Sequence, residues 1–364
     1  MRKVPGTIEA GETYPPHPSR PGPAAVRAGL LAAGWLVVAA LGLVALLRLV
    51  AWDSVEPLIV LDALTLIIYL PAWVVAAWAL IARRWWLGAA AAVIVAAQLA
   101  FVLPELLAAA PVPAWARHAP VVRVFDANIK QNLQFQAGYV RAIEQDRPDL
   151  ITLEEFSPSA LQGMEASGVL ASFPYRCVAP EYGASGFLIA SRLRLTGCQV
   201  QAVAGDDPGP PHGDGPGPPY GDPGTPYMVE ATLWSPGGPV ALRLVHTLAP
   251  LPAYWREWSA ALAAVDQSVR ASGDGRMLMV GDFNATWGNK GFVALLHDGL
   301  TDGAAARGKA TDMTWPNGLV AVVPPFVRID HVLTGARLAV TEIAAKPGFG
   351  SDHRYLTATV AIRP

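Results

Sequence analysis

The chain has 364 residues, of which 52% are hydrophobic and only 15% are charged, and its net charge is −2. This composition departs from that of an average soluble protein, and the apolar excess is concentrated in residues 26–110. A basic excess is missing, which argues against a nucleic-acid binder, because contacts to phosphates provide most of such a protein's affinity. The two cysteines, Cys177 and Cys198, are too few for a disulfide framework or a zinc site.

The N-terminal third of the sequence predicts a membrane segment. Residues 1–25 are rich in Pro, Gly and polar residues, and we expect them to be disordered. Apolar spans follow at residues 26–49, 57–82 and 85–107. About 20 apolar residues cross a hydrocarbon core of ~30 Å, so each span is long enough. Three such spans in succession favour a three-helix, multi-pass membrane segment over buried core helices.

Basic residues flank these spans unevenly. They precede the first span and separate the second from the third: Arg2, Lys3, Arg20, Arg27, Arg83 and Arg84. The positive-inside rule therefore predicts a cytoplasmic N-terminal tail. Three spans then place everything after residue 110 on the outer face of the cell membrane. Asp62 and Glu105 lie within the spans, and we expect them to be solvated at the outer interface.

Residues 111–120 form a short linker to the rest of the chain. An extended residue covers at most ~3.6 Å, so about ten residues reach ~35 Å. We therefore expect the following domain to stay close to the bilayer surface.

The domain at residues 121–364 alternates between strand and helix patterns, which predicts an α/β fold. Strands are expected at residues 121–126, 150–153, 187–190, 228–234, 240–246, 277–280, 327–333 and 355–362. Helices are expected at residues 133–146, 253–269 and 290–296. Residues 205–226 are rich in Pro, Gly and Asp, and we predict a flexible surface loop there.

Six short polar motifs end apolar, strand-like runs. They are Phe125-Asp126-Ala127-Asn128-Ile129, Thr152-Leu153-Glu154-Glu155-Phe156, Leu244-Val245-His246-Thr247-Leu248, Gly281-Asp282-Phe283-Asn284, Ile329-Asp330-His331 and Ser351-Asp352-His353. Strand ends are where an α/β sheet places its chemistry. Carboxylates, amides and imidazoles together suit a hard divalent cation and acid–base catalysis on a phosphoester.

In this order, the motifs resemble the endonuclease/exonuclease/phosphatase superfamily, the DNase I-like metal-dependent phosphoesterases. The resemblance covers residues 120–364 and implies a four-layer α/β sandwich that binds Mg²⁺ or Mn²⁺. It makes Glu155 the first metal ligand. Asp352 is the second candidate, and Asn128 can either supply a carbonyl ligand or donate its amide to the phosphate. The family usually has Gln where this chain has Glu154, so the choice between the two glutamates stays open.

The resemblance also implies catalytic roles. His353 would face the scissile phosphate, and Asp330 would orient its ring. Asp282 would position or deprotonate the attacking water, and Asn284 would donate a hydrogen bond to a phosphate oxygen. His246 would stabilise the developing charge or protonate the leaving oxygen.

One histidine and the two cysteines are given no catalytic role. His331 is expected to pack rather than to take part in catalysis. Cys177 and Cys198 flank a predicted hairpin, and they either form a disulfide in an oxidising exterior or remain thiols.

These expectations describe a membrane-anchored, Mg²⁺-dependent phosphoesterase that hydrolyses a phosphate ester or pyrophosphate. Three spans before such a domain are similar to the VanJ-type teicoplanin-resistance proteins, which implies a lipid-linked cell-envelope substrate and a role in antibiotic resistance. A small phosphoester is a further candidate substrate. One alternative is a membrane-tethered extracellular nuclease, which the sparse lysines disfavour. Another is a non-enzymatic membrane-binding module, which the complete polar motifs disfavour.

Overall fold

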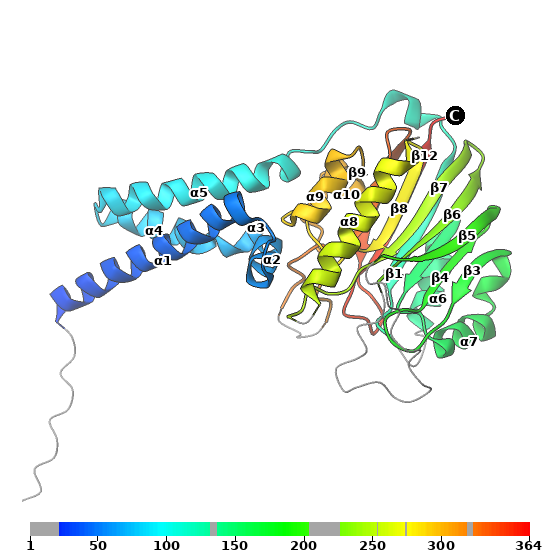
Figure 1. Ribbon diagram of the computed structural model, residues 1–364, viewed down its shortest axis with the longest axis horizontal. Coiled ribbons are helices and arrows are strands. Elements are labelled where there is room, and N and C mark those ends of the chain that lie inside the picture. The colour runs from blue at the N-terminus through cyan, green and yellow to red at the C-terminus, as the bar shows by residue number, and fades with distance from the viewer. Residues whose placement is uncertain (1–21, 132–136, 204–225, 253, 274, 319–322) are drawn as a thin grey trace, which may run out of the picture.

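The computed structural model describes residues 22–364 except 132–136, 204–225, 253, 274 and 319–322. Residues 1–21 of the tail predicted to be disordered and nearly all of the loop predicted at 205–226 lie outside the described residues. The tail prediction is wrong for residues 23–25, which already belong to the first helix. An elongated group of helices leads into a compact α/β sandwich (Figure 1). The boundary lies at residues 107–113, which have no regular structure.

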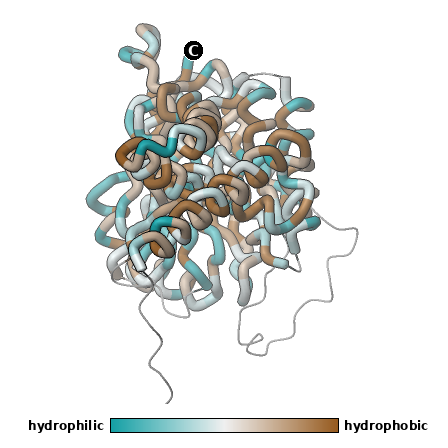
Figure 2. Tube along the Cα trace, turned by 90° about the vertical axis from the view of Figure 1, so that its left-hand side faces the viewer, coloured by the Kyte–Doolittle hydropathy of each residue, from teal (hydrophilic) through white to brown (hydrophobic). Residues whose placement is uncertain are grey.

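Five helices form the N-terminal group. They are α1 (Pro23–Ala51), α2 (Glu56–Ala63), α3 (Thr65–Ile68), α4 (Leu70–Ile81) and α5 (Trp85–Leu106). Within the described residues, α1 and α5 are each long and apolar enough to cross a membrane, with mean hydropathies of 2.6 and 2.2. Figure 2 colours most of the residues of these helices as hydrophobic.

The predicted second span is not one straight helix. The chain bends by 76° between α2 and the stretch Thr65–Ile81, so the described residues contain two continuous candidate spans, or three if the bent pair counts as one. Two local features interrupt the helical hydrogen bonds here. At the bend, the Thr65 hydroxyl donates to the Asp62 carbonyl at 2.5 Å. Further along, at the break between α3 and α4, Pro71 lacks the amide that a continuous helix needs. The expectation of three uniform spans is corrected accordingly.

Two six-stranded sheets form the sandwich. The first has the strand order β11 (Leu338–Lys346), β12 (Tyr355–Ile362), β1 (Val121–Asn128), β2 (Leu150–Glu154), β4 (Phe187–Ser191) and β3 (Tyr175–Ala179). The second has the order β5 (Leu195–Ala202), β6 (Tyr227–Ser235), β7 (Gly238–His246), β8 (Met277–Asp282), β10 (Asp330–Thr334) and β9 (Thr301–Asp302). Within the described part of the chain, the only strand pairs that run parallel are β1–β2 and β7–β8. Their carboxyl ends meet at one edge of the sandwich.

Helices cover the outer face of each sheet (Figure 1). The helices of the domain are η1 (Ala114–Arg117), α6 (Ala137–Asp146), α7 (Pro158–Ser167), η2 (Val169–Ser172), α8 (Trp255–Ser272), α9 (Lys290–His297) and α10 (Gly303–Ala306). In α8 the buried Trp258, Leu262 and Val265 recur at helical spacing and pack on the second sheet. Fully burying one such side chain contributes about 1.5–3 kcal/mol. The predicted layered α/β sandwich is confirmed.

Most strands begin and end within a few residues of their predicted positions. β10 begins at Asp330 instead of residue 327, because Val327 forms an isolated bridge with Trp315. The sequence pattern did not predict β3, β5, β9, β11, α7 or α10. Cys177 and Cys198 form a disulfide with a Cα–Cα distance of 6.3 Å, which settles the open choice between a bridge and free thiols. This bond joins β3 to β5, the edge strands of the two sheets.

Candidate active site

Strand register brings the predicted site residues to a common edge. In the first sheet, Asn128 at the end of β1 lies opposite Glu154 at the end of β2. In the second sheet, Asp282 at the end of β8 lies opposite both His246 of β7 and Asp330 of β10. Each of these residues is the last or first of its strand, so its side chain can leave the ladder and face the opposite sheet.

Asn128 connects the two sheets through its side-chain amide. Its Nδ2 donates to Glu155 Oε1 at 3.0 Å and to Asp282 Oδ2 at 3.1 Å. The Nε2 atom of His246 lies 3.9 Å from each of the same two oxygens. His353 completes the group, with its Nε2 3.7 Å from Asp282 Oδ2. Residues from the predicted motifs of both sheets therefore converge on one site.

His353 is held as an imidazolium by carboxylates. Its Nδ1 lies 3.1 and 3.0 Å from the two oxygens of Asp330. Burial lowers the pKa of His353, but the negative charges of Asp330 and Asp282 outweigh burial and raise this pKa from 6.5 to about 10. Asp330 is itself placed by its backbone amide, which donates to the Thr314 hydroxyl at 3.3 Å. The ring therefore carries a positive charge at neutral pH.

His246 is in the opposite charge state. Burial and the nearby charge of His353 lower its pKa from 6.5 to about 4. Its Nδ1 lies 2.9 Å from the carbonyl oxygen of Ala184, which can only accept a hydrogen bond. The proton of the neutral ring therefore sits on Nδ1, and the lone pair of Nε2 faces the site.

Asp282 and Asn284 form a tight turn after β8. The backbone amide of Asn284 donates to Asp282 Oδ1 at 2.8 Å, and its Nδ2 donates to the carbonyl of Thr247 at 2.9 Å. Burial, followed by the charge of Asp330, raises the pKa of Asp282. Asn284 has a φ of +46° and Glu155 a φ of +53°, a left-handed conformation that is uncommon for residues other than glycine. Both unusual backbones occur at the site.

The residues present fit a divalent cation at Glu155. Burial raises the pKa of this carboxyl. Among the described residues, no Lys or Arg lies within ion-pair distance of it, although Asn128 donates to it. A buried carboxylate is costly without a paired cation, and carboxylate oxygens are ligands that Mg²⁺ prefers. Asn128 turns Nδ2 rather than its oxygen to Glu155, and its Oδ1 accepts from the Lys130 amide at 2.9 Å, so Asn128 orients the carboxylate instead of offering a ligand atom. The ligand atoms of Asp282, Asp330 and His353 also lie within 4.8 Å of one another. However, an imidazolium has no lone pair to offer a metal.

The third metal candidate, Asp352, lies at the mouth of the site. Its carboxylate forms an ion pair with Lys130 at 3.0 Å. Both residues line an open hollow of about 250 Å³, together with Asn317 and Ser351. Sequence reasoning missed Lys130. The available signal was a lysine two residues after Asn128 in a domain with few lysines.

Glu154 does not share the environment of Glu155. Its side chain is fully buried between the sheets, next to the carboxyl of Asp126. Burial and the charge of Asp126 raise the pKa of Glu154, and burial also raises that of Asp126, to about 7. Thr152 donates to Asp126 Oδ1 at 2.6 Å, whereas Asp126 Oδ2 and both oxygens of Glu154 have no hydrogen-bond partner among the described residues. Although Glu154 is the strand partner of Asn128, the structure thus places the carboxylate of Glu155, and not that of Glu154, against the Asn128 amide.

His331 packs beneath the site. Its ring contacts Phe283 and Phe292, and its Nε2 lies 3.0 Å from the carbonyl of Ala285. This is the packing position expected for it.

The fold and the site together define a DNase I-like α/β sandwich with a polar centre at the carboxyl ends of its parallel strands. A model of the Endonuclease/Exonuclease/phosphatase family matches residues 127–353, which is more than half of the chain. The chain therefore belongs to this family, whose members are hydrolases that act on phosphoesters. No curated protein sequence matches the chain significantly.

Solved structures share the fold of the domain. Truncated Caenorhabditis elegans TDP2 is 18% identical, with a TM-score of 0.52 over 66% of this chain and 97% of that chain. D. rerio TDP2 complexed with single strand DNA product is 16% identical, with a TM-score of 0.51 over 66% of this chain and 98% of that chain. A family protein from Bacteroides thetaiotaomicron is 11% identical, with a TM-score of 0.51 over 68% and 100%. At these identities the likeness establishes the fold alone.

Proposed function

We propose that this protein is a membrane-anchored, Mg²⁺-dependent phosphoesterase that hydrolyses a lipid-linked phosphate ester or pyrophosphate on the outer face of the cell membrane. The observation that carries the proposal is the Asn128 amide, which ties the metal candidate Glu155 to Asp282, 3.7 Å from the charged His353. Anion binding, water activation and cation binding thereby share one site.

Each side chain has a role that follows from its state. A cation held by Glu155, which the Asn128 amide orients, would supply Lewis-acid stabilisation of the phosphoryl oxygens. Asp282 orients the attacking water and takes its proton. The imidazolium of His353 pairs with phosphate oxygens. His246 is neutral before the reaction, so its Nε2 accepts a hydrogen bond. Of the two histidines, His353 is the one that is protonated at neutral pH.

The case for a membrane-borne substrate comes from the rest of the chain. The candidate spans and the short linker keep the domain at the bilayer surface. The Cys177–Cys198 disulfide is typical of an oxidising compartment, which supports an extracytoplasmic domain. The net charge of −2 offers little attraction to nucleic acid. A cell-envelope substrate agrees with the resemblance to VanJ-type proteins.

The test is a Mg²⁺-dependent phosphate-release assay on the full chain in detergent micelles. The panel contains polyprenyl phosphate, polyprenyl pyrophosphate, phosphatidic acid, and single-stranded and duplex DNA. We expect release from a lipid phosphate, lowered about 10²–10⁴-fold in Asp282→Asn. We also expect a higher Mg²⁺ requirement in Glu155→Gln. Strongly salt-dependent DNA cleavage without lipid hydrolysis would identify the nuclease alternative. Equal activity in the double variant Asp282→Ala, His353→Ala would identify a binding module.

A further inference from the structure

The loop that follows the catalytic turn of β8 is bound by the membrane segment. The carbonyl oxygen of Gly288 accepts from Arg48 Nη1 at 2.8 Å and from Trp52 Nε1 at 2.9 Å. The same Arg48 nitrogen lies 3.2 Å from Asp62 Oδ1 and 2.9 Å from the Thr65 hydroxyl. One arginine of α1 therefore fixes both the bend between α2 and α3 and a loop of the catalytic domain.

Asp53 caps the same loop from the α1–α2 connector, residues 52–55. Its carboxylate accepts from the backbone amide of Lys290 at 2.6 Å and from Asn289 Nδ2 at 3.2 Å. Asn289 Nδ2 also donates to the carbonyl of Ile59 at 3.0 Å. A Cβ at Gly288 would lie 1.9 Å from the Asp62 carbonyl oxygen, so the loop approaches α2 at glycine distance.

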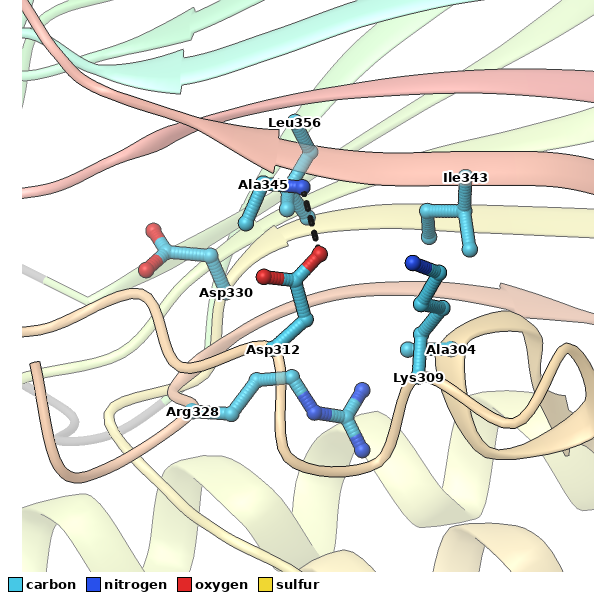
Figure 3. A pocket seen from close by; sticks show the side chains of 8 residues that line it. All are labelled: Ala304, Lys309, Asp312, Arg328, Asp330, Ile343, Ala345 and Leu356. Atoms are coloured by element: carbon cyan, nitrogen blue, oxygen red, sulfur yellow. Dashed lines mark hydrogen bonds between the residues drawn. The ribbon is translucent and has the colours of Figure 1, made fainter.

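A second connection reaches the start of β10. Arg328 Nη2 lies 3.0 Å from Glu105 Oε1 near the end of α5 and 2.6 Å from Asp302 Oδ2. The Arg328 guanidinium points away from the carboxylate of the neighbouring Asp330 (Figure 3). Arg328 Nη1 also lies 3.3 Å from His331 Nδ1, and the other nitrogen of that ring reaches the Ala285 carbonyl. The segments that adjoin Asp282 and Asp330 are therefore both tied to membrane helices.

These contacts are shielded from solvent. Less than a tenth of the surface is exposed in each of the charged residues Arg48, Asp53, Asp62 and Glu105, and Asn289 is 1% exposed. Asp62 and Glu105 are therefore not the solvated interfacial residues that the sequence suggested. Water cannot replace a lost partner at such positions, so each missing contact leaves an unpaired polar group. A flexible tether would need none of this polar matching.

We propose that the membrane segment is a structural part of the active site, in which Arg48 and Asp53 are positioning residues for Asp282 and Asn284. They act through residues 285–290, which continue directly from the catalytic turn. The Asn284 carbonyl also accepts a hydrogen bond from Trp258 Nε1 of α8 at 3.0 Å. Releasing the loop on the membrane side lets Asn284 leave its left-handed conformation. The catalytic part of this inference rests on the proposed function, whereas the structural part does not.

The experiment compares variants of the full chain in detergent micelles. Asp53→Ala removes both acceptors, and Asp53→Asn keeps one oxygen for the Lys290 amide. Arg27→Ala changes an exposed arginine on the same helix as Arg48 and serves as the matched control. Gly288→Ala adds a methyl group that collides with the Asp62 carbonyl, so it pushes the loop at residues 285–290 away from α2. Hydrogen–deuterium exchange then follows a peptide covering residues 283–290 beside a reference peptide from β1 and β2.

We expect the loop peptide to exchange at least tenfold faster in Asp53→Ala and Gly288→Ala, and at an intermediate rate in Asp53→Asn. The reference peptide and Arg27→Ala should match the wild type. With p-nitrophenyl phosphate as the probe, Asp53→Ala should lower kcat up to about 10²-fold at an unchanged KM, because misplaced groups lose rate rather than binding. Asp53→Asn should recover part of that loss.

Three outcomes would overturn the proposal. The first is that the loop peptide exchanges at the wild-type rate in both Asp53→Ala and Gly288→Ala. The second is that the loop and reference peptides exchange faster by the same factor in Asp53→Asn. The third is that Asp53→Ala changes KM and leaves kcat at its wild-type value. If the wild-type chain hydrolyses neither the probe nor any lipid phosphate, the proposed function fails. The exchange data still decide whether the membrane segment holds the loop.

Discussion

The Arg328 ion pairs allow a quantitative prediction for the variant Arg328→Met. The Arg328 side chain is 1% exposed and bridges Asp302 at 2.6 Å and Glu105 at 3.0 Å. At an effective dielectric constant of about 20, each pair has a gross attraction of about 5–6 kcal/mol. Burial of the charges offsets part of that attraction. The loss of the arginine also leaves two buried carboxylates without a cation, so breaking the cluster should cost about 3–5 kcal/mol in unfolding free energy.

The assay is thermal unfolding of the detergent-solubilised protein at pH 7.5, followed by near-UV circular dichroism. A loss of about 3–5 kcal/mol corresponds to a Tm lower by roughly 6–20 °C for a domain of this size. Arg123→Met is the matched control, because Arg123 is 48% exposed in its 3.3 Å pair with Asp149. Exposed pairs contribute at most about 1 kcal/mol, or roughly 4 °C. A Tm shift in Arg328→Met no larger than that in Arg123→Met would show that the buried ion pairs of Arg328 do not stabilise the fold.

Three further predictions concern titration and the disulfide. Asp330→Asn removes the charge that most raises the pKa of His353 from 6.5 to about 10, so the alkaline limb of the pH–rate profile should move down by about 1–3 pH units. His246 has a pKa of 6.5 when unfolded and about 4 when folded; the unfolded state binds the extra proton, so stability is fully present above 6.5 and is lost as pH falls toward 4. His246→Gln should therefore lose about 3 kcal/mol less than the wild type on acidification from pH 7.5 to 4 in urea titrations. Replacing Cys177 and Cys198 by serine should lower the unfolding free energy by about 3 kcal/mol in the same titrations, and an unchanged midpoint would contradict a structural role for the bond.

The parts of the fold that follow from local patterns were predictable. Strands such as β8 and β12 are apolar runs with polar residues at their ends, and that pattern is visible within a few residues. Edge strand β5 was missed because Gln199 and Gln201 make it polar and exposed on both faces. In α7, Ser157 caps the first turn by accepting from the Ala160 amide, and Pro158 follows it. That cap and proline were available in the sequence as a start signal.

The site residues were predictable as a set because each ends a strand, but their surroundings were not. The state of His353 depends on Asp330, which comes from a different sheet, and the state of His246 depends on a loop carbonyl at Ala184. The contacts between the membrane segment and residues 285–290 could not be predicted from the sequence at all. Arg48 and Gly288 are separated by 240 positions, and no local pattern in either segment indicates the other.

The left-handed backbones of Glu155 and Asn284 set stability against activity at these two positions. Each such conformation costs of order 1 kcal/mol in a residue with a side chain, and glycine adopts it freely. Selection for thermal stability alone should therefore enrich the variants Glu155→Gly and Asn284→Gly, which would be more stable but would no longer turn over substrate. A directed-evolution campaign on this scaffold would need to select for turnover and thermal tolerance together.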